Sequence, residues 1–298
     1  MLSTHEVTTS PLTGSSGSLR ALTVVEVKRL ARHPVFVLGV LATAFFTATA
    51  TGRSDDVYNP SIIGGFFLGL FSMIAMFRLT RSMDKAEAAV ESTPAAQRQR
   101  TLALCLATIL PAVLGVITFV ATYEFSKPKA DWNLAGYGTG AQLAIFFGNI
   151  VIACVGGPLL GVVAGRWWRF PGAVVVLTVA VLFWVLFSEG MADQFHDKTW
   201  ATFLHLSAPW TQFTSIDTDL QQVAQWRGSP FWHIAWSISL CVLAVLGALL
   251  KTAEGEDRKR YFRQGLVVGL VGLVFLTLAV VLGPDHATMF TPSGSHRY

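Results

Sequence analysis

Seven long apolar runs, none with an acidic or basic residue in its core, constrain the fold of this chain more than any other feature. Each run is long enough to cross about 30 Å of hydrocarbon as a helix, at roughly 1.5 Å per residue. A single Asp, Lys or Arg at a helix centre would cost about 2.5–3.5 kcal/mol on the insertion scale, so the absence of such residues favours true spans. The runs lie near residues 35–51, 60–78, 101–123, 141–165, 170–188, 231–250 and 264–282.

The composition agrees with a membrane protein. Of the 298 residues, 52% are hydrophobic and only 13% are charged, whereas a soluble domain carries about a quarter charged residues. The apolar runs leave no segment long enough for a separate soluble domain. All three cysteines fall inside apolar runs without metal-like spacing, so neither a disulfide framework nor a metal site is expected from them.

The basic residues predict the orientation of the spans. One side of the seven-span topology comprises the N-terminal tail and the segments 79–100, 166–169 and 251–263, with Arg78 at its edge. This side carries 16 of the 22 Lys and Arg residues, and the other side carries the remaining 6. Because cytoplasmic segments are enriched in Lys and Arg, the N-terminus is expected in the cytoplasm and the C-terminus outside.

The segment before the first run predicts a short basic helix. Residues 1–18 are rich in Ser, Thr and Gly and are expected to form a disordered cytoplasmic tail. From Ser18, a plausible N-cap, to Pro34, which should start the next element, leucine and valine recur at near-helical spacing. We expect an amphipathic helix in the headgroup region, with basic side chains that meet lipid phosphates: Arg20, Lys28, Arg29 and Arg32.

Several classes of chemistry are excluded by missing motifs. The sequence contains no G-x-x-x-x-G-K-[ST], so the chain is not expected to bind ATP phosphates by itself. It also lacks H-E-x-x-H and a suitably placed G-x-S-x-G, which argues against an enzyme. The spans contain no carboxylate or lysine for a proton relay or cation site, which argues against an ion-driven transporter.

A few polar or flexible positions inside the spans remain candidates. Asn149 could line a translocation path, or its amide could hydrogen-bond a neighbouring helix. Gly156-Gly157-Pro158 could act as a hinge or permit close helix packing. The outer segment contains Glu189, Asp193, His196, Asp197 and His205, but their spacing matches no compact metal motif, and no metal site is predicted.

The segment DKAEAAVESTPAAQRQR, from Asp84 to Arg100, interrupts the apolar runs on the expected cytoplasmic side. On a helix, Asp84, Glu87 and Glu91 would form an acidic stripe, and Pro94 is expected to end that helix. One interpretation is a solvated connector. The other is a short helix along the membrane that offers an acidic surface to a cytoplasmic partner.

The order of these features resembles the permease subunits of the ATP-binding-cassette type-2 exporter family, in particular those of high-GC Gram-positive bacteria. The resemblance covers roughly residues 19–250. Its motifs are LRALTVVEVKRLARHP, ESTPAAQRQRTLA, GVVAGRWWRFPG, LSAPW and SPFWHIAWSISL.

This resemblance implies an all-α integral membrane protein with a six-span permease core, an N-terminal elbow helix and, as an addition, a seventh transmembrane helix. It implies that Asp84, Glu87 and Glu91 form a coupling helix that docks onto a separate ATPase subunit. Arg166 and Arg169 would form a secondary coupling turn. The implied partners are that ATPase, which would hold ATP and Mg²⁺, a second permease copy or paralogue, and membrane lipid, with no nucleic acid and no cofactor of the chain's own.

The expected domain organisation follows the same order. Residues 1–18 form the tail, 19–250 the permease domain with an external loop at 188–230, 251–263 a basic cytoplasmic loop, and 264–298 the extra helix and an external tail. The expected location is the bacterial plasma membrane. Two other functions stay open: a non-transporting scaffold or signalling anchor for a cytoplasmic partner, and a membrane-embedded enzyme.

Overall fold

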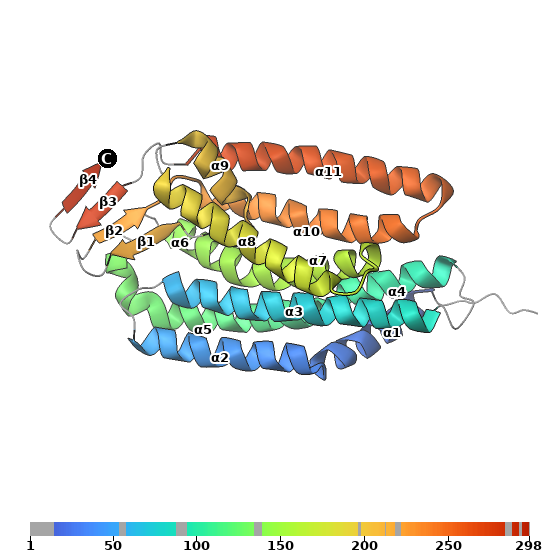
Figure 1. The fold of residues 1–298 in the computed structure, drawn as a ribbon. Coiled ribbons are helices and arrows are strands. Elements are labelled where there is room, and N and C mark those ends of the chain that lie inside the picture. The colour runs from blue at the N-terminus through green and yellow to red at the C-terminus, as the bar shows by residue number, and fades with distance from the viewer. Residues whose placement is uncertain are drawn as a thin grey trace, which may run out of the picture.

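In a computed structural model, the chain forms a bundle of long helices that lie side by side, with a small β-sheet at one end (Figure 1). The structure describes residues 15–53, 58–87, 94–133, 139–195, 198–211, 213–217, 222–283, 288–291 and 294–297. Successive long helices run in alternating directions, so consecutive connections lie at opposite ends of the bundle.

The elements of the described residues are as follows. The helices are α1 (Ser15–Ala31), α2 (Pro34–Arg53), α3 (Tyr58–Glu87), α4 (Pro94–Ala107), α5 (Ile109–Asn133), α6 (Thr139–Phe146), the π-helix η1 (Phe147–Ile152), α7 (Ala153–Trp167), α8 (Ala173–Gln194), α9 (Thr199–Ser207), α10 (Pro230–Thr252) and α11 (Gly255–Val281). The strands are β1 (Thr214–Asp217), β2 (Gln222–Gln225), β3 (Thr288–Thr291) and β4 (Gly294–Arg297).

Six continuous helical segments among the described residues are long and apolar enough to cross a membrane, which indicates a multi-pass membrane protein. They match the last six runs predicted from the sequence: Ile62–Ser82, Gln97–Phe125, Thr139–Trp167, Ala173–Gln194, Pro230–Thr252 and Gly255–Val281. The first predicted run corresponds to α2. Its described part, Pro34–Thr49, passes the same test only together with Ser18–Ala31, from which it is bent by 64°.

The helices differ in how much of their apolar surface the protein itself covers. In the apolar windows of α3 and of the α6–α7 span, 61% and 67% of the residues are buried. The corresponding shares are only 17% for α8 and 22% for α11, which expose large side chains such as Phe183 and Leu270. The centre of the bundle is therefore the pair α3 and α7, and the apolar outer surface of α8 and α11 is suited to lipid.

Glycine lets α3 and α7 approach each other closely. A Cβ atom added to Gly69 would meet the carbonyl oxygen of Ala153 at 2.9 Å. A Cβ atom at Gly157 would collide with the backbone of Gly69, and one at Gly161 with the carbonyl of Met73. Gly157 therefore serves close helix packing, which is one of the two roles expected from the sequence.

One predicted helix start is wrong and one is confirmed. Pro94 is the first residue of α4, a position where its missing N–H and fixed φ cost nothing, and the segment 88–93 before it lies outside the described residues. Ser18 is not an N-cap, because α1 already begins at Ser15. Pro34 does start the next helix, as predicted.

The predicted basic loop at 251–263 is mostly helix. The connection between α10 and α11 consists of residues 253–254, and α11 begins at Gly255. Gly255 has a φ of +54°, which permits this sharp turn. The basic residues Arg258, Arg260 and Arg263 therefore lie on the first turns of α11 rather than in a loop.

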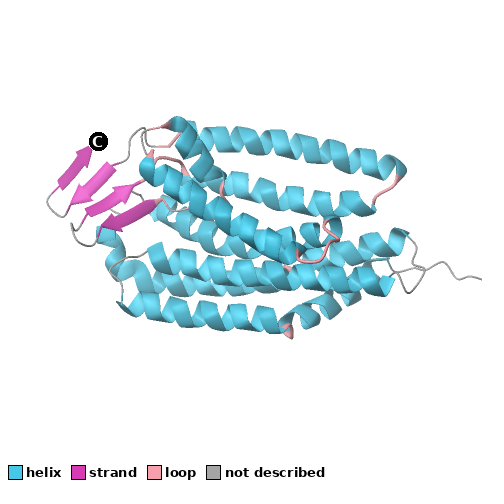
Figure 2. Cartoon of the chain, in the orientation of Figure 1, coloured by secondary structure: helices cyan, strands magenta, loops and turns pink. Residues whose placement is uncertain are grey.

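The antiparallel sheet has the strand order β1-β2-β3-β4 and lies beyond one end of the bundle (Figure 2). Thr214 pairs with Gln225 between β1 and β2, and Val223 pairs with Phe290 between β2 and β3. The sheet was not predicted: β1 and β2 lie in the segment 188–230 that was expected to be an external loop, and β3 and β4 lie in the expected external tail. The segment 188–230 also contains the short helix α9. The prediction of an all-α protein holds for the bundle alone.

Candidate functional site

The candidate site is the end of the bundle opposite the sheet, called here the basic end. It gathers α1, the C-terminal part of α3, the start of α4, the turn at 168–172 and the α10–α11 connection (Figure 1). The 16 Lys and Arg residues assigned to one side by the sequence lie in these segments or in the adjoining ends of α7, α10 and α11. The other end holds the sheet and α9.

The helix α1 carries a buried carboxylate that the sequence analysis missed, and the arginine paired with it links α1 to α3. Glu26 is only 5% exposed, and the Nη1 of Arg29 lies 2.8 Å from its Oε1. The Nη2 of Arg29 also donates a hydrogen bond of 3.0 Å to the Oγ of Ser82 on α3. The acidic residue three positions before an arginine was the only signal for this pair in the sequence.

The predicted basic residues of α1 therefore fall into two groups. Arg20, Lys28 and Arg32 are exposed, and their contact with lipid headgroups stays a prediction. Arg29 is half-buried and is engaged within the protein. The buried face of α1 is centred on Glu26 and Leu30.

His33, at the bend between α1 and α2, is a further ionisable group at this end. Its pKa is lowered from the usual 6.5, first because burial disfavours the charged imidazolium and second because the Arg78 guanidinium repels it. The Nδ1 atom of His33 is buried and has no hydrogen-bond partner in the described part of the chain. Both observations favour a neutral imidazole at neutral pH.

The structure places two of the three predicted docking carboxylates at the tip of α3. Asp84 and Glu87 lie on the last turns of this helix, which continues without a break from the apolar span. They are thus on an extension of a central helix and not on a separate helix. Glu91 lies outside the described residues.

The predicted secondary coupling turn is only partly exposed. Arg166, in the last turn of α7, is 4% exposed, so its side chain belongs to the interior of the bundle. Arg169 is exposed, and its backbone carbonyl accepts a hydrogen bond of 2.9 Å from the Nη2 of Arg81 on α3. Of the two arginines, only Arg169 can meet a partner directly.

Polar contacts also link the other helices of the basic end. The Nε1 of Trp167 donates a hydrogen bond of 2.9 Å to the carbonyl of Gly247, which joins α7 to α10. The Nη1 of Arg98 on α4 lies 3.4 Å from the Oδ2 of Asp257 on α11, and its guanidinium lies over the ring of Tyr261. Because exposed ion pairs contribute only about 0–1 kcal/mol, these contacts define the arrangement of the helices more than the stability of the bundle.

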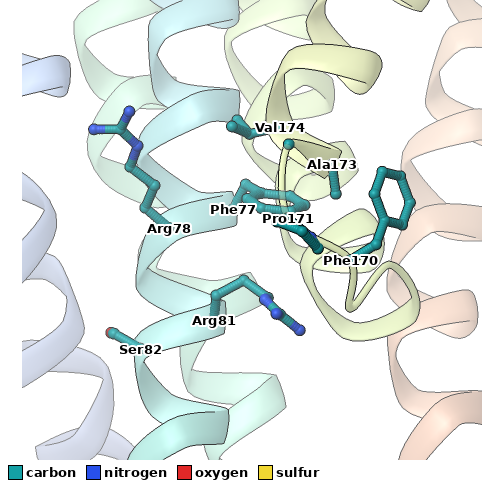
Figure 3. Close-up of a pocket in the computed structure, with 9 residues that line it drawn as sticks. Phe77, Arg78, Arg81, Ser82, Phe170, Pro171, Ala173 and Val174 are labelled. Carbon is teal, nitrogen blue, oxygen red and sulfur yellow. The ribbon is translucent and has the colours of Figure 1, made fainter.

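A cavity of about 340 Å³ opens at the same end, between α3 and the turn that leads into α8 (Figure 3). Two of its lining residues, Arg78 and Arg81, are basic, and most of the others are apolar. The full lining consists of Phe77, Arg78, Arg81, Ser82, Phe170, Pro171, Gly172, Ala173 and Val174.

Asn149 lies apart from the basic end, in the π-helix η1. It is 2% exposed, and its Nδ2 has no hydrogen-bond partner in the described part of the chain. Its backbone carbonyl lies against Gly65 of α3. The expected hydrogen bond from this amide to a neighbouring helix is therefore not seen, and a role in translocation stays a prediction.

Among the described residues, no group of three or more His, Cys, Asp and Glu side chains could hold a metal ion. At the sheet end, the Nδ1 of His205 lies 3.7 Å from the Oε2 of Glu189. Two other acidic or histidine residues of that segment, His196 and Asp197, lie outside the described residues.

Comparisons of this chain with models of protein families, with curated proteins and with solved structures found no match.

Proposed function

We propose that this chain is the membrane-spanning subunit of an ATP-driven exporter of the ATP-binding-cassette type, located in a bacterial plasma membrane. The order of sequence motifs supports this proposal. The observation that carries it is the position of Asp84 and Glu87 at the tip of α3, beside the basic helix α1 and the turn at 168–172. A separate ATPase would dock on this surface.

The packing of α3 explains how docking could be coupled to the spans. The tip of α3 extends past the apolar span, and the rest of the helix is packed backbone to backbone against α7. Close-packed interfaces shift between discrete arrangements rather than deforming smoothly. A force applied at Glu87 would therefore move α3 and α7 together and change access to the interior of the bundle.

The cargo and the dimer belong to the same proposal. Because the cores of the spans contain no charged residue, an amphipathic cargo such as a drug, lipid or peptide suits them best. A second permease copy or paralogue would complete the path, and the extra helix α11 would lie at its periphery.

The alternative function is a scaffold or signalling anchor that holds a soluble partner at the basic end without transport. The same exposed surface would serve it. The two functions differ in the partner: the exporter requires a subunit with ATPase activity, whereas the scaffold does not.

Charge reversal at the tip of α3 tests the proposed function. Asp84→Lys with Glu87→Lys should reduce recovery of a copurifying ATPase at least several-fold, since each change turns an attraction into a repulsion. The matched control is Glu256→Lys, at an exposed glutamate on the first turn of α11, which should leave recovery unchanged. Membrane insertion of all variants is measured in parallel by detergent extraction and size exclusion.

Equal recovery of the ATPase with the double variant and the wild type would refute the docking surface. Recovery of a partner without ATPase activity would favour the scaffold.

A further inference from the structure

The cavity beside α3 combines a positive end with an apolar wall. Arg78 and Arg81 of α3 both line it. In Figure 3 the Arg81 side chain extends toward the turn that carries Phe170 and Pro171, whereas the Arg78 side chain extends away from that turn. None of the nine residues that line the cavity is acidic.

Two further features make the cavity suited to an anion. The bond from Arg81 to the Arg169 carbonyl uses one of the five N–H donors of the guanidinium and fixes the side chain at the cavity. The helix α8 begins at Ala173 on the cavity wall, and a helix N-terminus carries a partial positive charge.

The apolar wall indicates what kind of anion would bind. Phe77 and Ala173 are buried behind the cavity, and Phe170 is 48% exposed at its mouth. Both arginines lie in the last turns of the apolar segment Ile62–Ser82, where a spanning helix reaches the headgroups of the bilayer. A free phosphate ion would gain nothing from this wall, whereas a lipid presents a phosphate and an acyl chain together.

We propose that this cavity binds the phosphate headgroup of an anionic lipid from the leaflet at the basic end. The phosphate contacts Arg81, and the first part of an acyl chain lies along Phe77 and Val174. Basic pockets between transmembrane helices recognise acidic lipids by this combination of charge and depth. The site is independent of the proposed function, because it requires no ATPase.

Lipid retention by the purified full-length chain tests the site. The chain is delipidated in mild detergent, supplied with phosphatidylglycerol or phosphatidylcholine, and examined by native mass spectrometry and by thermal unfolding. The wild type should retain phosphatidylglycerol and unfold at a higher temperature with it than with phosphatidylcholine. Arg81→Gln should weaken retention about five-fold, the effect expected for one basic side chain near an anionic headgroup.

Two variants separate this site from a general effect of charge. Arg263→Gln removes an exposed arginine of α11 outside the cavity and should leave retention unchanged. Val174→Phe keeps Arg81 but fills the cavity, and should reduce retention as Arg81→Gln does.

Equal retention by the wild type, Arg81→Gln and Val174→Phe would overturn the proposal. The same stabilisation by inorganic phosphate alone would also overturn it, since the cavity would then be a site for a free anion.

Discussion

At the scale of single residues, the ion pair of Glu26 and Arg29 joins two side chains that differ greatly in solvent exposure. The Glu26 side chain is 6% exposed, whereas that of Arg29 is 39% exposed. If Arg29 is removed, the carboxylate stays buried without its partner. If Glu26 is removed, the guanidinium can turn toward water.

Arg29→Ala is therefore expected to lower the free energy of unfolding by about 1–3 kcal/mol, the cost of an unsatisfied buried polar group. Glu26→Gln should cost less, and Lys28→Ala, at an exposed site on the same helix, should have little effect. Thermal unfolding in detergent measures this order. A larger loss for Glu26→Gln than for Arg29→Ala would contradict the account of this pair.

His33 gives the protein a predicted sensitivity to acid. Since its pKa in the folded protein is lowered, the unfolded chain binds more protons than the folded one once the pH falls below 6.5. Stability contributed by the neutral imidazole is thus present at neutral pH and is lost as the pH falls from 6.5 through the lower, folded pKa. The unfolding temperature should drop less between pH 7.5 and pH 5.5 for His33→Gln than for the wild type. Identical drops for both proteins would show that His33 is not involved.

At the scale of elements, the sequence analysis identified the spans well because lipid leaves few alternatives. Apolar runs of this length must satisfy their backbone groups internally, so they form helices whatever their neighbours are. The ends of helices were less predictable. Ser18 is compatible with an N-cap or with a position inside a helix, and the structure shows the second, because α1 begins at Ser15.

The sheet and the cavity could not be predicted for a different reason, since both depend on tertiary contacts. Each strand has only four residues, and β2 pairs with β3 from the far end of the chain. The cavity requires the turn before α8 to lie against Arg78 and Arg81 of α3. By contrast, the clustering of basic residues at one end followed directly from counting them along the sequence.

The close packing of α3 against α7 can be tested by a substitution at one glycine of the contact. Gly161→Leu would place a side chain against the Met73 carbonyl, and overpacking of this kind typically costs about 1–3 kcal/mol. Gly269→Leu is the matched control, because a Cβ at Gly269 on α11 meets nothing within 4 Å. Size exclusion after heating should show a lower midpoint for Gly161→Leu alone. If Gly269→Leu lowered the midpoint as much as Gly161→Leu, close packing of α3 and α7 would not explain the loss of stability.

At the scale of the whole molecule, the proposals share one requirement: the basic end must face the cytoplasm. The ATPase would reach Asp84 and Glu87 only from that side, and the anionic lipid would come from the inner leaflet. The 16 to 6 division of Lys and Arg residues predicts this orientation. With that orientation the sheet, which Figure 1 shows at the opposite end of the bundle, would lie outside the cell.

Two-sided cysteine labelling in whole cells measures the orientation directly. Ala253→Cys, between α10 and α11, reports on the basic end, and Ser295→Cys, in β4, reports on the sheet end. The wild type gives the background from its own cysteines, which lie within spans. A membrane-impermeant maleimide should label Ser295→Cys in intact cells and Ala253→Cys only after permeabilisation. The reverse pattern, or labelling of both from one side, would contradict a cytoplasmic basic end and both sites assigned to it.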